Sequence, residues 1–214
     1  MTTVRGRITA MRCGDADART MQRRRERRRH PERERERERR VTLCRASCVV
    51  RRRSAASMRA VVQRVARGGV TVDGEDSART IGRGLVVLVG IGVDDDDGDM
   101  EYIARKVFNT KLWPSEDGSK QWARSAKDCD FDVLFISQFT LHAELKGNKP
   151  SYHRAASPTT AEPLYDAFIE HARANYLAAA GKGKIECGEF GAMMEVDIQN
   201  DGPVTLILDS KSKN

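Results

Sequence analysis

The stretch LVVLVGI, residues 85–91, and the pattern that follows it decide the fold class. An unbroken apolar run of this length is typical of a central strand that is buried on both faces. The acid-rich run DDDDGD, residues 94–99, suits the start of a helix, and apolar residues then recur at three- and four-residue spacing from Met100 to Phe108. A buried strand that leads into an amphipathic helix predicts a sheet with helices packed on it.

Further strands are expected on both sides of this unit. Residues 60–65, AVVQRV, and residues 70–72, VTV, are rich in β-branched residues, and Gly68-Gly69 between them predicts a hairpin turn. Residues 131–141 are interpreted as a second buried strand whose last residues become polar. Residues 185–198 and 204–208 are expected to be the closing strands.

The remaining segments are interpreted as connections and one more helix. Residues 116–118, EDG, predict a turn, and residues 143–158, which contain several Gly, Asn and Pro residues, predict a long loop. An apolar stripe through residues 161–180 predicts a second helix. We therefore expect one α/β domain over residues 58–214, with helices packed on a curved, barrel-like sheet.

The first 57 residues differ sharply in composition from the rest of the 214-residue chain. They hold 19 Arg and 7 acidic residues, a net charge of +12, whereas the remainder holds 19 basic and 24 acidic residues, a net of −5. Residues 23–40, RRRERRRHPERERERERR, contain almost nothing apolar, so we expect the extension to be disordered. The basic character of the whole chain therefore says little about the domain.

Composition also excludes some classes of protein. No stretch approaches the roughly 20 apolar residues of a membrane span, so no membrane partner is expected. Five scattered cysteines argue against a disulfide scaffold, and Cys44 and Cys48 lack a second ligand pair for zinc. We expect a cytoplasmic protein, with organellar targeting by residues 1–57 left open because Arg, Ser and Ala are plentiful there.

The sequence does not match the usual patterns of dinucleotide, calcium or histidine metal sites. Gly82-x-Gly84 lacks a third glycine and precedes a strand, whereas a dinucleotide fingerprint follows one. The acidic run 94–97 lacks the first and last ligands of a calcium loop. His142, His153 and His171 show no metal-ligand spacing, and each suits a surface or polar loop better than a catalytic base. No metal and no cofactor are expected.

Two short elements remain as candidates for chemistry. Residues 137–141, SQFTL, end a buried strand with hydroxyl and amide groups, and α/β folds place their sites at such strand ends, although these groups equally suit a strand that simply ends. Residues 200–205, NDGPVT, are expected to be a turn between two strands, in which Gly202-Pro203 is a candidate for a cis bond.

With these two elements the sequence closely resembles the D-aminoacyl-tRNA deacylase family. The resemblance covers residues 58–210 in order, and it is carried by the motifs MRAVVQRV (58–65), ARK (104–106), SQFTL (137–141), LKGNKP (145–150), FGAMM (190–194) and NDGPVT (200–205). LKGNKP and IQNDGPVT (198–205) look like the eukaryotic branch. Residues 1–57 have no counterpart, and Met58 looks like the usual start.

The resemblance implies hydrolysis of the ester that joins a D-amino acid, or glycine on the wrong tRNA, to the terminal adenosine of tRNA. An aminoacyl ester is already activated, so the enzyme must mainly position water and offer donors to the developing oxyanion. By analogy with the family, the catalytic residues are Ser137, Gln138, Phe139 and Thr140, with the backbone N–H groups of Phe139 and Thr140 as the donors.

The resemblance also implies a homodimer. In the family a cis Gly-Pro pair of one subunit enters the pocket of the other and excludes L-amino acids, so Gly202 and Pro203 inherit this role. Arg64 matches the arginine that holds the pair, and Met194 matches a residue of the pocket lining. Without the resemblance, Arg64 would be interpreted as a solvated strand residue, and Met194 equally suits the core.

Two alternatives stay open. Thr140 is a candidate for a covalent nucleophile, but its hydroxyl needs an adjacent base and only His142 is near it in sequence. We favour assistance by the 2′-hydroxyl of the substrate. In the other alternative the chain is a nucleic-acid-binding protein that acts through its arginine-rich extension, with the domain as a dimerisation platform.

Overall fold

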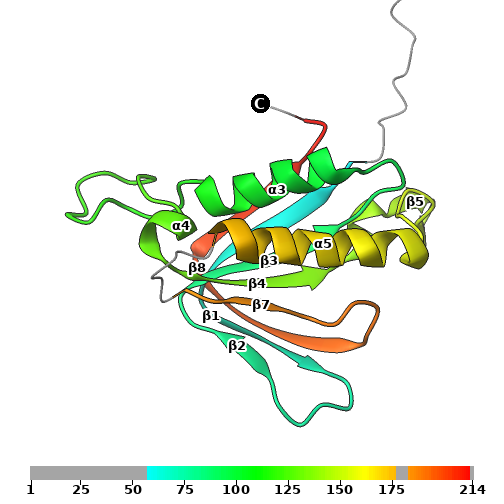
Figure 1. The fold of residues 1–214 in the computed structure, drawn as a ribbon, viewed down its shortest axis with the longest axis horizontal. Coiled ribbons are helices and arrows are strands. Elements are labelled where there is room, and N and C mark those ends of the chain that lie inside the picture. Colours follow the sequence, from blue (N-terminus) through cyan, green and yellow to red (C-terminus); the bar gives the residue numbers. More distant parts are fainter. Residues whose placement is uncertain (1–56, 177–182, 213–214) are drawn as a thin grey trace, which may run out of the picture. The chain divides into compact units, whose positions relative to one another are not determined.

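The computed structural model describes residues 57–176 and 183–212, and the fold is given for these residues (Figure 1). The expected disorder of the N-terminal extension falls almost wholly outside them. So do residues 177–180, where the second helix is expected to end. No helix within the described ranges is long and apolar enough to cross a membrane.

A six-stranded, strongly curved sheet, nearly closed into a barrel, forms the centre of the domain. Its strands follow the order β2-β1-β3-β4-β7, with β8 paired to the other edge of β1. The strands are β1 (Arg59–Val72), β2 (Arg79–Ile81), β3 (Gly84–Gly90), β4 (Asp132–Ser137), β7 (Ile185–Cys187) and β8 (Met194–Asp209). Strands β3, β4 and β7 are parallel, and β1 is antiparallel to β2, β3 and β8.

Two long helices, α3 (Asp97–Asn109) and α5 (Pro158–Tyr176), lie side by side over one face of this sheet (Figure 1). The short helix α4 (Ala126–Cys129) precedes β4. Asp96 caps α3, since its side chain accepts from the backbone N–H of Asp99 while the Asp99 carboxylate accepts from that of Asp96. The acidic helix start and the stripe from Met100 to Phe108 are thus confirmed.

Both faces of β3 are buried, as the run LVVLVGI predicted. Leu85, Val87 and Val89 belong to the large core between the sheet and the helices. Val86 belongs to a second apolar cluster on the opposite, concave face, together with Val65, Val70, Ile81, Leu134 and Ile136. The expected α/β domain with helices on a curved, barrel-like sheet is confirmed.

The hairpin predicted at Gly68-Gly69 is wrong. β1 runs straight through both glycines for 14 residues, and the chain turns instead after Val72, where Gly74 has a φ of +85°. Gly68 is needed for close packing and not for a turn, because a Cβ there would lie 2.6 Å from the Val86 side chain. The returning strand is β2, whose Ile81 pairs with Gly68.

The second buried strand is shorter than predicted. β4 ends at Ser137, and residues 139–142 form the 3₁₀ helix η1 (Phe139–His142). This turn folds over the end of β3, where a Cβ on Gly90 would lie 3.0 Å from the Gln138 carbonyl oxygen. Thr140 and Leu141 therefore lie beyond the strand.

The predicted long loop contains regular structure. It holds a small hairpin, β5 (Glu144–Lys146) and β6 (Lys149–Ser151). Its last residue, Pro158, is already the first residue of α5, a position that suits proline because the missing N–H has no helical partner there. The turn at residues 116–118 is confirmed, with Gly118 at a φ of +70°.

The closing strands also differ from the prediction. β8 is one long strand that pairs with β1 along its length, and residues 200–205 are not a turn between two strands. Asn200 pairs with Val65 and Val204 with Arg64, so residues 201–203 loop out of a strand that then continues in the same direction. We call these three residues the β8 excursion.

Candidate functional site

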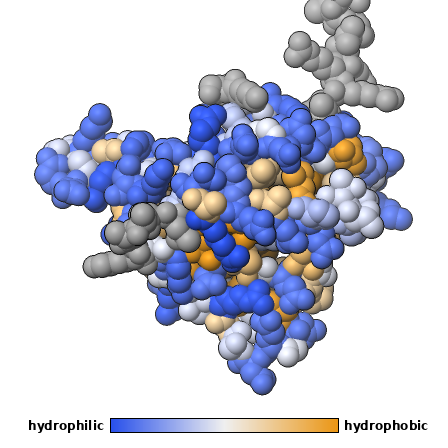
Figure 2. All heavy atoms as spheres, viewed as in Figure 1, coloured by the Kyte–Doolittle hydropathy of each residue, from blue (hydrophilic) through white to orange (hydrophobic). Residues whose placement is uncertain are grey.

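A cavity of about 570 Å³ opens where β4 gives way to η1. Its walls come from the ends of β3 and β4, from Tyr152 and the start of α5, and from the segment that joins β7 to β8. Figure 2 shows apolar atoms gathered on the face below the N-terminal half of α5. The lining residues are Ile91, Ile136, Ser137, Gln138, Phe139, Tyr152, Ala155, Ala156, Pro158, Ala161, Phe190, Gly191, Ala192, Met193, Met194 and Val196.

Three of the four residues of SQFT lie at this cavity, and Thr140 is not among its lining residues. Ser137, Gln138 and Phe139 line it, and Phe139 is 55% exposed. The N–H of Leu141 donates to the carbonyl oxygen of Gln138, the first hydrogen bond of η1. The N–H groups of Phe139 and Thr140 precede that bond, so the helical geometry supplies them with no acceptor.

The Thr140 hydroxyl is held by an amide and not by a base. Gln138 Nε2 donates to Thr140 Oγ1 at 2.7 Å. His142, expected in a surface or polar loop, is instead buried at 1% exposure, and burial lowers the pKa of its imidazole. Its ring packs against Gly90 at the end of β3. Thr140 Oγ1 is bonded to Gln138, and the buried His142 Nε2 has no hydrogen-bond partner among the described residues, so the two side chains do not make a nucleophile-base pair.

The β8 excursion packs against the guanidinium of Arg64. Arg64 Nε donates to the carbonyl oxygen of Asp201 at 3.1 Å, and Nη1 donates to that of Leu112 at 2.5 Å. The guanidinium also lies 3.3 Å from the Asp201 carboxylate. The Arg64 side chain is only 14% exposed, so it is not the solvated strand residue that its place in the sequence suggests.

Gly202 is required by the shape of this excursion. It has a φ of +120°, and a Cβ there would lie 2.9 Å from Arg64 Nη2. The Gly202–Pro203 peptide bond is cis, as predicted. Both residues are exposed, whereas the guanidinium beneath them is largely buried.

The structure brings some of the predicted site residues together and keeps others apart. Met194 lies on the cavity wall with Ser137, Gln138 and Phe139. Arg64 and the excursion lie beside Leu85 at the opposite end of β3, whereas Ser137 lies beside Val89. Four residues of strand span about 13 Å, so one chain does not place its own Gly202-Pro203 in its own cavity.

Sequence reasoning missed much of the cavity wall. Tyr152 and Phe190 supply aromatic surface, and Ala155, Ala156 and Ala161 keep the space open by being small. Tyr152 packs edge-on against Phe139 with ring centroids 5.0 Å apart. The sequence held two signals for this wall: the FGAMM motif, whose residues 190–194 all line the cavity, and a tyrosine in a loop that follows a strand end. Within residues 57–176 and 183–212, no group of three His, Cys, Asp or Glu side chains is placed to hold a metal ion.

Comparison with known proteins decides the family. The family model described as D-Tyr-tRNA(Tyr) deacylase matches residues 61–209. The chain belongs to the D-aminoacyl-tRNA deacylase family. It is 51% identical over 156 residues to the D-aminoacyl-tRNA deacylase of Dictyostelium discoideum, covering 73% of this chain and 100% of that protein. It is 46% identical over 153 residues to D-aminoacyl-tRNA deacylase 1 of Homo sapiens, covering 72% and 70%.

Solved structures agree with the fold. A structure titled "c-Myc DNA Unwinding Element Binding Protein" superposes with a TM-score of 0.62 at 46% identity, covering 70% of this chain and 97% of that chain. A structure described as a "probable eukaryotic D-amino acid tRNA deacylase" superposes with a TM-score of 0.61 at 21% identity, covering 72% and 99%. The family resemblance seen in the sequence is confirmed.

Proposed function

We propose that this chain hydrolyses the ester bond of D-aminoacyl-tRNA and of mischarged glycyl-tRNA, and leaves L-aminoacyl-tRNA intact. The observation that carries the proposal is the cavity at the end of β4, lined by Ser137, Gln138 and Phe139, in a chain of this family. Its lining is largely apolar, and it has the backbone N–H groups of a turn at its edge. Such a cavity suits an aminoacyl group whose ester carbonyl points to the strand end.

Because an aminoacyl ester is already activated, its hydrolysis mainly requires that the water and the hydrogen-bond donors are correctly placed. In this proposal the backbone N–H groups of Phe139 and Thr140 donate to the carbonyl oxygen that becomes negative in the transition state. Ser137 and Gln138 add polar groups to the cavity wall. Water attacks the ester carbonyl carbon, the bond from that carbon to the ribose oxygen breaks, and the ribose oxygen takes up a proton from the water, which frees the amino acid and restores the ribose hydroxyl. The Thr140 hydroxyl is bonded to the Gln138 amide and not to a base, so we do not assign it the activation of the water. We assign that assistance to the neighbouring 2′-hydroxyl of the terminal ribose.

Selection between D and L substrates is assigned to the β8 excursion of a second subunit. D and L substrates differ by the exchange of hydrogen and side chain at one carbon, so the discriminating surface must touch that carbon. The backbone of Gly202 and Pro203, braced by Arg64, makes a wall that does not move aside as a side chain would. Glycine has no side chain and passes this filter.

A homodimer suits the exposed surface of β8. This strand pairs with β1 along one edge, and its other edge has no strand partner within the described ranges. Ile207 is 76% exposed, and Val196 and Ile198 are each 37% exposed along the same strand. A long edge strand with exposed apolar residues is a surface that proteins normally cover.

The direct test is a hydrolysis assay of the purified full chain with D-, L- and glycyl-tRNA side by side. We expect release of D-amino acids and glycine and none of L-amino acids. Ala192→Trp, which places an indole in the cavity from a loop, should abolish release while the melting temperature stays close to that of the parent chain. If the parent chain binds tRNA but releases nothing, the proposed hydrolysis is wrong. The alternative, binding through the arginine-rich extension, then requires that a chain starting at Met58 loses the binding.

Mixing two variants tests the exchange between subunits. A chain with Gly202→Ala keeps its cavity and should hydrolyse L-aminoacyl-tRNA, because its excursion is distorted. An excess of the Ala192→Trp chain supplies an intact excursion to each remaining open cavity, so hydrolysis of the L substrate should fall. If it does not fall, selection takes place within one chain and the cross-subunit arrangement is wrong.

A further inference from the structure

Two lysines face each other at the tip of the small hairpin. In the β5–β6 register Lys146 pairs directly with Lys149, and both are exposed. Gly147, at a φ of +63°, helps to close the two-residue turn between them. Cβ atoms of directly opposed residues lie about 5 Å apart, and like charges in this position destabilise a hairpin. The arrangement therefore opposes the stability of the element that carries it.

No acid in the described ranges forms an ion pair with either lysine. Residues 145–154, LKGNKPSYHR, contain three basic residues and no acidic one. Glu144, at the base of the hairpin, is already bonded to Arg154 Nε at 2.7 Å and lies 3.3 Å from His153 Nε2. The hairpin tip is thus a local concentration of positive charge in a region of the chain that is acidic on balance.

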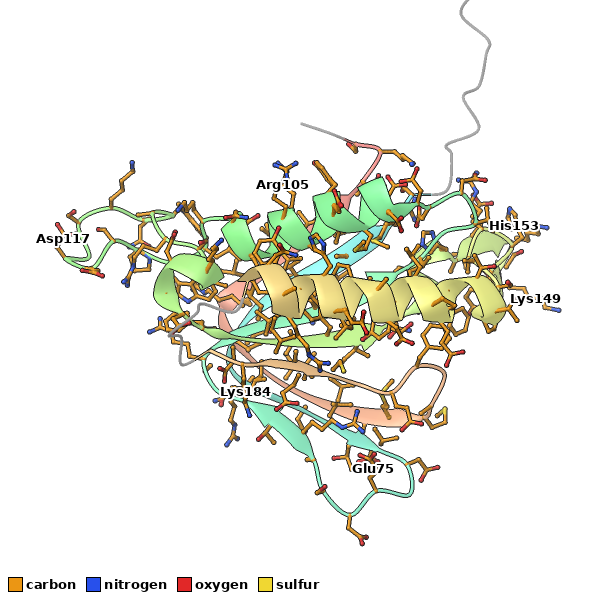
Figure 3. The ribbon with its side chains drawn as sticks, in the orientation of Figure 1. Glu75, Arg105, Asp117, Lys149, His153 and Lys184 are labelled. Carbon is orange, nitrogen blue, oxygen red and sulfur yellow. The ribbon has the colours of Figure 1, made fainter. Side chains whose placement is uncertain are left out.

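The tip projects from the edge of the cavity. β6 ends at Ser151, and the next residue, Tyr152, lines the cavity with its ring against Phe139. The three residues from Tyr152 back to Lys149 span about 10 Å of strand. Figure 3 shows Lys149 and His153 together at the end of the molecule where α5 begins, with Lys184 far from them.

We propose that Lys146 and Lys149 bind the backbone phosphates of the single-stranded 3′ end of the tRNA substrate. The proposal rests on the proposed function, because an adenosine ester held in the cavity places the preceding phosphates at its edge. A phosphate between two ammonium groups converts their mutual repulsion into attraction to a shared anion. Contacts to phosphates carry no base sequence, so this anchor accepts any tRNA.

The test compares a substrate that has phosphates with one that lacks them. The full chain with Lys146→Gln and Lys149→Gln is assayed for tRNA binding across a range of salt, and for hydrolysis of D-aminoacyl-tRNA and D-aminoacyl-adenosine. The log–log salt slope should fall by about 0.7 if one phosphate is shared and by about 1.4 if each lysine binds its own. KM for the tRNA substrate should rise, with kcat and hydrolysis of the adenosine ester unchanged.

Lys120→Gln with Lys184→Gln removes the same charge from exposed lysines outside the hairpin and should leave the slope unchanged. The proposal is overturned if the control variant lowers the salt slope of tRNA binding as much as the hairpin variant does, or if the hairpin variant leaves that slope unchanged. It is also overturned if the hairpin variant loses the same activity on D-aminoacyl-tRNA and on D-aminoacyl-adenosine. An inactive parent chain that keeps the slope difference would instead refute the proposed function alone.

Discussion

The substitution Arg64→Lys tests how much the hydrogen bonds of Arg64 contribute to holding the β8 excursion in place. The arginine reaches two segments at once, with Nε on the Asp201 carbonyl oxygen and Nη1 on the Leu112 carbonyl oxygen. A lysine ammonium keeps the charge but cannot span both carbonyl groups, so one of them loses its donor. Hydrogen bonds to charged groups contribute about 1.5–3 kcal/mol each, and we expect a loss of about 2 kcal/mol.

That loss is measurable in two independent ways. For a domain of this size it lowers the melting temperature by roughly 4–8 °C. If the excursion is the wall against L substrates, the ratio of kcat/KM for D- over L-aminoacyl-tRNA should fall roughly tenfold for each 1.4 kcal/mol by which the wall is loosened. Arg79→Lys is the matched control, since Arg79 also donates to a backbone carbonyl, that of Cys187, but lies away from the excursion.

The two readouts separate stability from selection. The control should lose stability without any change in the ratio of D to L hydrolysis. A stable Arg64→Lys chain would show that the two hydrogen bonds contribute little. A chain that is destabilised but still rejects L substrates as well as the parent does would refute the argument that the braced excursion discriminates.

Three further changes have defined outcomes. Thr140→Ala should lose far less activity than the roughly 10⁶-fold that follows removal of a covalent nucleophile, and trapping an aminoacyl-Thr140 adduct would contradict this. A chain that begins at Met58 should deacylate nearly as well as the full chain, because the proposed site lies within residues 57–212; folding with loss of most activity would assign a role to the extension. Burial raises the pKa of Asp95 to about 6, so its ionised form destabilises the fold. This carboxyl stabilises the fold below pH 4 and loses that contribution as the pH rises through 6. Asp95→Asn keeps an acceptor for the Gly92 N–H and should add roughly 1 kcal/mol at pH 7 after solvent screening, and nothing at pH 4, in urea unfolding.

Local pattern was sufficient for the elements that bury one continuous face. The stripe through α3 is such an element, and the unbroken run at residues 85–91 was equally recognisable because it is buried on both faces, so its apolar pattern directly reports which side chains must leave water. Gly68-Gly69 was misleading for a physical reason. Glycine serves a turn and a close approach between strands equally well, and only the position of Val86 decides between them.

The arrangement of the candidate site depended on tertiary structure more than the strands and helices did. The sequence by itself determined the family, through SQFTL, NDGPVT and the motifs between them, and with it the residues around Ser137 and Gly202 to consider. The sequence did not determine that the Arg64 side chain is largely buried against the β8 excursion. That contact follows from the pairing of β1 with β8, a strand about 140 positions later in the chain. Nor did the sequence determine the cavity, whose walls come from four separate segments between Ile91 and Val196. Spacing along a chain encodes local periodicity, whereas the register between distant strands sets which side chains meet.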